Sequence, residues 1–331
     1  MRIALIAIVV LALAAVSLLY LAPPQPVIAV APEAVFDIAS LEVTNTMFTS
    51  WVVVLLLVVG GYFVGRRMSL VPSGFSGAVE AVVGGFYEFI EKIVGEANAR
   101  RFFPVVATIF FYVLISNYFG LLPINIAIGK PEIGHGETQA AFEQTSVGGL
   151  DIAYINFDAE TIEVEGEAGD HEGEEGAGEP FGVLAPYFRS VMTDVNAPAA
   201  LAIWSFIFVE FWGLQSLGVG YLKKFFNFGK LLRGDLLGGL IDVFVGVLEF
   251  VSELSRMVSF TFRLFGNIFA GEVLLLMMTF LVPFVLVDVF YGLELFVGLV
   301  QAFVFAMLTL VFAVTAVTHH SDDHHEGEGA H

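Results

Sequence analysis

One arginine lies inside one of the longest apolar runs of the chain, SFTFRLFGNIFAGE at residues 259–272. Arg263 carries a permanent positive charge, and its nearest acidic residue along the sequence is Glu272. A charged side chain at the centre of a membrane helix costs about 2.5–3.5 kcal/mol on insertion scales, so such residues usually face a cavity, a partner or an ion path. The chemistry open to Arg263 is therefore to bind an anion or to control the passage of an ion.

Other ionisable residues in the same apolar segment have a simpler explanation. Glu249 or Glu253 is close enough in sequence to form a salt bridge with Arg256, and this structural explanation stays open for these three residues. It is weak for Arg263, because Glu272 lies nine residues further on, about 180° away on the opposite face of a helix. The sequence therefore predicts that Arg263 has no ion-pair partner on its own helix.

The polar residues of the last two apolar segments separate into sets at different depths. At about 1.5 Å per residue, Glu272 lies about 13 Å from Arg263 in one direction and Glu249 about 21 Å in the other. Asn267 shares the face of Arg263, and Glu294 shares a face with Gln301 seven residues later. The predicted sets are an outer one (Glu272, Glu294), a central one (Arg263, Asn267, Gln301) and an inner one (Glu249). Two offset polar sets separated by a fixed cation predict two half-channels with a barrier between them.

The composition indicates an integral membrane protein. Of the 331 residues, 57% are hydrophobic and 15% are charged, and the mean hydropathy is +0.83. Soluble domains are about 45–50% apolar and about 25% charged. The excess lies in long blocks, as in several membrane helices. The chain has no cysteine, which excludes disulfides and thiolate metal sites.

The predicted fold is all-α: a polytopic membrane protein with about five membrane-embedded helices, one amphipathic surface helix and a long tilted C-terminal helical hairpin. Residues 74–101 have apolar residues at helical spacing with charges on other faces, which indicates the surface helix. Residues 235–281 would form a helix roughly 70 Å long, against a hydrocarbon core of about 30 Å, so the segment must bend, split or tilt steeply. The spans are expected at 46–64, 102–128, 196–221, 235–281 and 285–318.

Five regions are predicted along the chain. The apolar run Ile3–Ala22, ended by prolines, is either a signal peptide or a further membrane helix. The second half of the acidic, glycine-rich segment at 129–186 has few large apolar residues, so we expect a mobile loop. This segment lacks the ligand spacing of an EF-hand calcium site.

The C-terminal tail at 319–331 is expected to be disordered, with weak metal binding as the alternative. The regions are 1–30 (signal-like or extra membrane segment), 31–128 (first span, surface helix, second span), 129–186 (acidic external loop), 187–318 (third span and hairpin with the ion path) and 319–331 (His- and acid-rich cytoplasmic tail).

The basic residues predict the orientation of the spans. Lys and Arg cluster after the first span, around the surface helix and between residues 223 and 233, which are the expected cytoplasmic sides. Residues 131–180 contain fourteen Asp or Glu and no Lys or Arg, as expected of a loop outside the membrane. The C-terminus is then predicted to be cytoplasmic.

Several motifs resemble one known family. RLFGNIFAGE at 263–272 combined with LVQAFVFAMLTLVF at 299–312 is similar to subunit a of the F-type ATP synthase. MFTSWVVVLLL at 47–57, YFGLLPIN at 118–125 and DVN at 194–196 add support, and the resemblance covers about residues 40–128 and 187–318. Many members have a histidine at one of the two outer positions, whereas this chain has Glu272 and Glu294.

The resemblance implies a multi-pass stator in a bacterial plasma membrane, working in ATP synthesis coupled to proton transport. Arg263 would face a ring of c subunits and keep each passing ring carboxylate ionised. Protons would enter near Glu272 and Glu294 and leave past Glu249, with Asn267 and Gln301 beside the arginine. The implied partners are the c-ring, b-type peripheral stalk subunits and the lipid bilayer; Na⁺ stays open as the carried ion, and no nucleic acid or cofactor is expected. No GxxxxGK[ST] loop is present, so no catalytic residue is assigned to this chain.

Two other functions fit the sequence less well. A secondary transporter could use Arg263 to bind an anionic substrate, but such proteins commonly contain inverted repeats, and the RLFGN region has no second copy. A purely structural membrane scaffold would leave Arg263 and Glu272 without a role.

Overall fold

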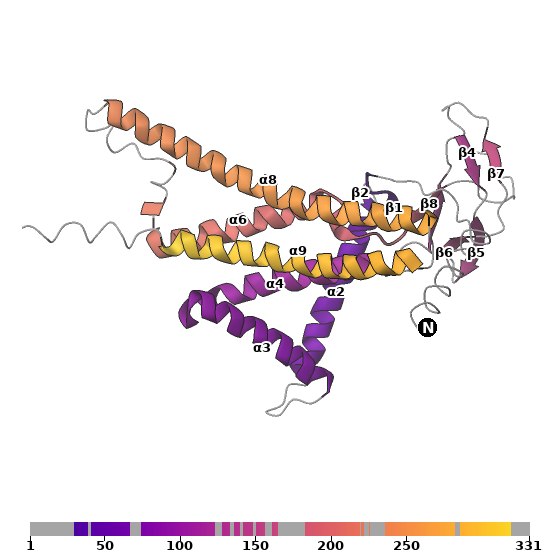
Figure 1. The fold of residues 1–331 in the computed structure, drawn as a ribbon, viewed down its shortest axis with the longest axis horizontal. Coiled ribbons are helices and arrows are strands. Elements are labelled where there is room, and N and C mark those ends of the chain that lie inside the picture. The colour runs from indigo at the N-terminus through magenta and orange to yellow at the C-terminus, as the bar shows by residue number, and fades with distance from the viewer. Residues whose placement is uncertain are drawn as a thin grey trace, which may run out of the picture. The chain divides into compact units, whose positions relative to one another are not determined.

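The structure is a computed structural model with six α-helices in the part of the chain that it describes (Figure 1). That part comprises residues 30–38, 41–66, 74–122, 128–132, 136–139, 142–147, 150–155, 161–164, 183–218, 220–221, 225, 236–281 and 285–318. The helices are α2 (Asn45–Arg66), α3 (Phe75–Val94), α4 (Glu96–Gly120), α6 (Asn196–Leu217), α8 (Leu236–Leu281) and α9 (Val285–Thr318), with a short 3₁₀ helix η1 (Val191–Thr193).

Five of these helices are long and apolar enough to cross a membrane: α2, α4, α6, α8 and α9. The remaining helix, α3, is the segment with charges on its non-apolar faces. The predicted all-α polytopic fold is therefore confirmed. The expected N-terminal apolar segment, the Lys223–Arg233 cluster, the Pro283 turn and the His-rich tail lie outside the described residues, apart from Phe225.

A glycine corrects one predicted boundary. We expect a single surface helix over 74–101, but the helix ends at Val94 and a new one begins at Glu96. Gly95 between them has φ 78°, a left-handed conformation that favours glycine, and its N–H donates to the Glu91 carbonyl at 2.8 Å. Residues 96–101 therefore belong to the second membrane helix.

Helix α8 is continuous over 46 residues. The sequence allowed three ways to fit this long segment into a membrane: bending, splitting or tilting. The prediction that it splits is wrong. Bending and steep tilt remain predictions.

Short antiparallel strands lie in the segments before α2 and between α4 and α6. The sequence predicts no strands there. In the acidic segment, β5 and β6 are rich in β-branched and aromatic residues and flank a Gly-Gly dipeptide, a composition typical of a hairpin. The most acidic stretch, residues 165–182, lies outside the described residues. The strands are β1 (Ala34–Ile38) paired with β2 (Leu41–Thr44), a sheet of order β5-β6-β3-β8 (Phe142–Val147, Leu150–Ile155, Gly129–Glu132, Val183–Pro186), and β4 (Gly136–Gln139) paired with β7 (Thr161–Val164).

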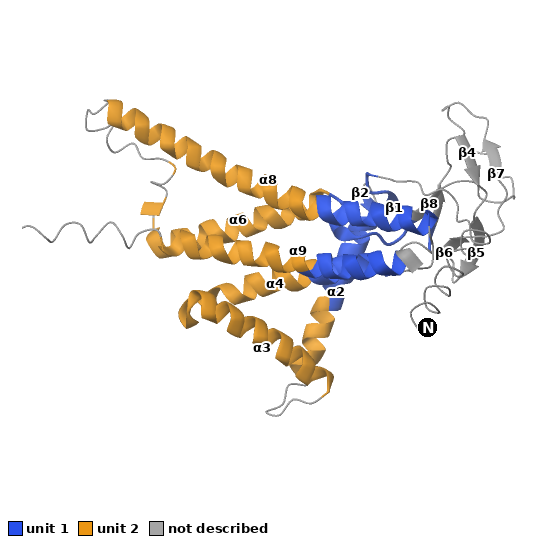
Figure 2. Cartoon of the chain, viewed as in Figure 1, with its two compact units in different colours: residues 1–56, 114–194, 266–299 blue, residues 57–113, 195–265, 300–331 orange. Residues whose placement is uncertain are grey.

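The chain divides into two compact units (Figure 2). Unit 1 comprises residues 1–56, 114–194 and 266–299, and unit 2 comprises residues 57–113, 195–265 and 300–331. Unit 1 packs Phe188 against Phe48 and Phe119, with ring centroids 5.3 and 5.7 Å apart. Unit 2 packs Phe102 of α4 against Trp212 of α6, with centroids 4.6 Å apart.

Inside unit 2, an arginine fastens α4 to the end of α6. The guanidinium of Arg101 donates to Ser216 Oγ at 2.9 Å, to Gln215 Oε1 at 2.8 Å and to the Trp212 carbonyl at 3.2 Å. A cation near the C-terminal end of a helix interacts favourably with the helix dipole. Arg101 thus holds together two of the helices that build the unit.

Candidate functional site

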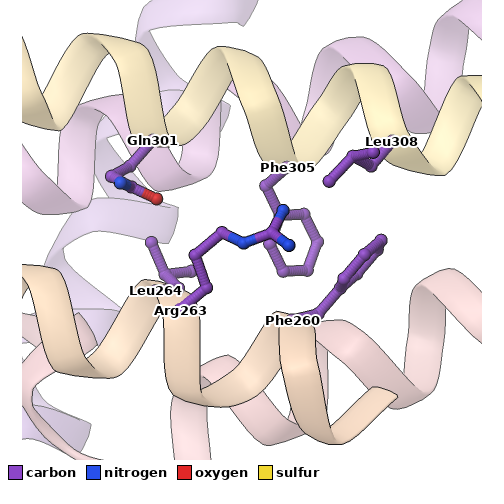
Figure 3. A pocket seen from close by; sticks show the side chains of 6 residues that line it. All are labelled: Phe260, Arg263, Leu264, Gln301, Phe305 and Leu308. Carbon is purple, nitrogen blue, oxygen red and sulfur yellow. The ribbon is translucent and has the colours of Figure 1, made fainter. Parts of the chain in front are cut away.

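Arg263 of unit 2 makes no hydrogen bond and no ion pair with the described residues. Its side chain extends from α8 toward α9, beside a small hollow that Gln301 and Phe305 also line (Figure 3). The guanidinium carbon lies 5.9 Å from the ring centre of Phe260, and the residue is exposed. The structure therefore places Gln301 near Arg263, as the predicted central set requires, and leaves the charge of the arginine without a carboxylate.

Arg256, the other arginine of α8, is paired with a carboxylate. Arg256 Nη1 donates to Glu253 Oε2 at 2.7 Å, and its guanidinium carbon lies 3.8 Å from the ring centre of Phe312 on α9. The Glu253 side chain is 4% exposed. The salt bridge that the spacing allowed for this pair is present, whereas Glu249, one turn earlier, is partly exposed.

A tyrosine after α6 makes a further polar contact in unit 2. The Tyr221 hydroxyl donates to Glu210 Oε1 at 3.2 Å. Burial, and then the nearby Glu210 carboxylate, raise the pKa of Tyr221, so its hydroxyl keeps its proton at neutral pH. The ring also fills the space beside Gly213, where an added Cβ would overlap it.

In unit 1, the predicted outer residue Glu272 forms an ion pair. Its Oε1 lies 3.3 Å from Nε of Arg189, whose side chain is 6% exposed. Arg189 is fixed at two further points: Nη1 donates to the Ala31 carbonyl at 3.0 Å, and its backbone N–H donates to Thr49 Oγ1 at 3.2 Å. Glu272 thus faces a cation that is anchored to the start of the described chain and to α2.

The sequence did not single out Arg189, because it lies outside the apolar segments. One signal could have found it: between Lys130 and Lys223, it is the only Lys or Arg. Asp194, which belongs to the DVN motif, accepts a hydrogen bond from Thr46 Oγ1 at 3.0 Å. The segment before α6 therefore supplies unit 1 with both a buried cation and a buried carboxylate.

The other outer residue, Glu294, is packed against a glycine. Glu294 is 7% exposed, and an added Cβ at Gly271 would overlap its carboxylate. One turn further along α9, Asn117 Nδ2 of α4 donates to the Gly298 carbonyl at 3.2 Å. Glu272 and Glu294 both lie in unit 1, where Glu272 has Arg189 as counter-charge. Asn267 is an exposed residue of α8 in this unit.

Unit 1 also contains several buried polar atoms that make no hydrogen bond within the described part of the chain. Such atoms in proteins are ordinarily satisfied by ordered water where the site is polar. Two of these atoms belong to α4, one to the first residue of α2, one to Ser190 and one to Glu272 itself. They are Asn45 Nδ2, Ser116 Oγ, Asn117 Oδ1, Ser190 Oγ and Glu272 Oε2.

Comparison with known proteins identifies the family of the chain. The family model described as ATP synthase A chain matches residues 47–313. The ATP synthase subunit a of Moorella thermoacetica is 24% identical over 292 residues, which cover 88% of this chain and 99% of the relative. The subunit a of Gloeobacter violaceus is 29% identical over 282 residues (85% and 86%), and that of Helicobacter pylori strain P12 is 26% identical over 287 residues (86% and 96%). The chain therefore belongs to the ATP synthase A chain family, subunit a of the F-type ATP synthase, and works in proton transport for ATP synthesis.

Proposed function

We propose that this chain provides two offset half-channels to a ring of c subunits, with Arg263 as the charge barrier between them. Each ring subunit would bring one carboxylate past the arginine. A proton entering through the first half-channel would neutralise that carboxylate, travel with the ring and leave through the second half-channel. The arginine would prevent the two half-channels from exchanging protons directly.

The unpaired charge of Arg263 carries this proposal. Among the described residues, Arg256 and Arg189 have carboxylates and Arg263 has none. A carboxylate passing at 4 Å would gain about 4 kcal/mol at an effective dielectric near 20, which favours its ionised form. An arginine fits this role better than a lysine, because a buried lysine can lose its proton.

The polar lining of unit 1 supports an entry path from the outside. Glu272 and Glu294 would carry protons along this path, and the buried polar atoms of the unit would hydrogen-bond water. Glu249, which is partly exposed on α8, would serve the exit on the cytoplasmic side. This sidedness rests on the distribution of Lys and Arg, which also puts the acidic loop outside and the C-terminus inside.

The partners follow from the same proposal. The c-ring would meet the exposed face of α8 that carries Arg263 and Asn267. The b-type subunits of the peripheral stalk would hold the chain against the torque of the ring. The carried ion would be H⁺, with Na⁺ decided by the binding site of the ring.

The test is ATP-driven proton pumping by the assembled complex in inverted membrane vesicles. Arg263→Ala should abolish pumping while the subunit is still present in the purified complex. Arg100→Ala is the matched control, because Arg100 is an exposed arginine whose partner is Glu96, one turn away at 2.6 Å. Exposed pairs of this kind contribute about 0–1 kcal/mol, so the control should pump normally. Pumping by Arg263→Ala at the rate of the control would refute the proposal.

A further inference from the structure

We propose that Glu253 is a positioning residue for ion translocation, which holds the charge of Arg256 away from the ion path. This inference rests on the proposed role of Arg263. Arg256, the second arginine of α8, must be held in place, because a free cation there would compete with Arg263 for the same ring carboxylate.

The spacing of the two arginines creates the problem. Arg256 and Arg263 are seven residues apart on one continuous helix, so they share a face about two turns apart. Both are always ionised. Without a restraint, a ring carboxylate that passes Arg263 would meet a second guanidinium on the same face.

Two contacts restrain Arg256. The buried carboxylate of Glu253, 2.7 Å away, supplies a counter-charge from the preceding turn of α8. The ring of Phe312, at 3.8 Å, offers its face to the guanidinium, which is a favourable cation–π geometry. Together they turn the side chain toward α9 and α6, where Ser205 and Val209 line the same hollow.

An aromatic residue separates the surroundings of the two arginines. Phe260 lines both the hollow beside Arg256 and the hollow beside Arg263. It is 6% exposed, and its ring packs on Phe305 and Phe312 with centroids 5.2 and 5.7 Å apart. The two hollows thus share an apolar wall, while Arg256 has a carboxylate in its hollow and Arg263 has none.

Removing Glu253 should affect ion translocation differently from removing Arg256. Glu253→Gln leaves Arg256 charged, because an arginine cannot lose its proton. Arg256→Gln leaves Glu253, which can take up a proton when buried without a counter-charge. A pair that served structure alone would be damaged in the same way by either change.

The experiment compares Glu253→Gln, Arg256→Gln and the double variant in the assembled complex. ATP-driven pumping is measured together with the rate at which a carbodiimide labels the ring carboxylate, a reaction that requires the protonated carboxyl group. Glu253→Gln should lower both rates about tenfold, the effect of about 1.4 kcal/mol of added preference for the ionised carboxylate. Arg256→Gln and the double variant should stay within about twofold of the parent, since neither contains a free second arginine.

Two results would overturn the inference: normal rates in Glu253→Gln, or equal losses in all three variants. If Glu253→Gln does not assemble, Glu253→Asp is compared with Glu253→Asp/Arg256→Gln. The shorter carboxylate should slow labelling only while the arginine is present, and equal labelling would overturn the inference. Arg263→Ala in the same series keeps the two proposals apart, because retained pumping in that variant refutes the proposed function instead.

Discussion

The contact between Gly271 and Glu294 makes a sharp prediction about side-chain volume in unit 1. Changing Gly271 to alanine adds a methyl group where the carboxylate of Glu294 lies. Glu294 is 7% exposed, so its carboxylate cannot simply move into solvent. The side chain must change its conformation, and overpacking of this kind costs about 1–3 kcal/mol.

The expected loss of activity is larger than the loss of stability. To restore an ordinary contact, the carboxylate must retreat on the order of 1 Å, and a displacement of that size can lower a rate about 100-fold. Glu294→Asp shortens the side chain by one carbon–carbon bond, about 1.5 Å, which is enough to remove the overlap. The double variant Gly271→Ala/Glu294→Asp should therefore pump faster than Gly271→Ala alone.

The assay is ATP-driven acidification of inverted vesicles, with rates divided by the amount of subunit in the assembled complex. Gly292→Ala of α9 is the matched control, because no atom lies within 4 Å of the methyl group it adds. It should pump normally, since alanine is also the better helix former. Normal pumping by Gly271→Ala, or no recovery in the double variant, would refute the reasoning.

Three other predictions concern neighbouring contacts. Arg189→Gln removes the counter-charge of Glu272, 3.3 Å away, and should reduce pumping at least tenfold. Arg189→Lys should restore little pumping, because one ammonium cannot reach both Glu272 and the Ala31 carbonyl. Full recovery of pumping in Arg189→Lys would contradict this reasoning. Arg101→Ala removes three hydrogen bonds to α6 and should lower the free energy of unfolding by about 1.5–3 kcal/mol. The measurement is the melting temperature of the purified complex, which should fall in Arg101→Ala and stay unchanged in Arg100→Ala. A cysteine at the exposed position of Asn267 should crosslink to a ring subunit, and a cysteine at the buried position of Ala302 should not; consistent failure at 267 would mean that another face of α8 meets the ring.

The helices were predictable because hydropathy dominates them. The bounds of α9 match the expected span at 285–318, and α8 begins one residue later than expected. The boundary at Gly95 was missed, because the apolar pattern continues through it and only the backbone conformation reveals the break. The strands of the acidic segment were missed for a different reason: charge composition hid a short run of β-forming residues at 142–155.

Within the site, the sequence could predict contacts between residues that are close together on one helix. The Glu253–Arg256 pair follows from three residues of separation on one helix. The pairing of Glu272 with Arg189 joins segments far apart in sequence, so no periodicity could indicate it. The fit of Glu294 against Gly271 is a matter of volume between two helices, which composition does not encode.

The unbroken length of α8 has a mechanical consequence. A part that stays still while its neighbour rotates must absorb a sideways push at every step, and a hinge would let the push become movement. The α-helical backbone is unbroken over all 46 residues, and Arg263 lies well inside it rather than at an end. If a ring of subunits moves past Arg263 as proposed, an unbroken helical backbone at that point would resist local unwinding.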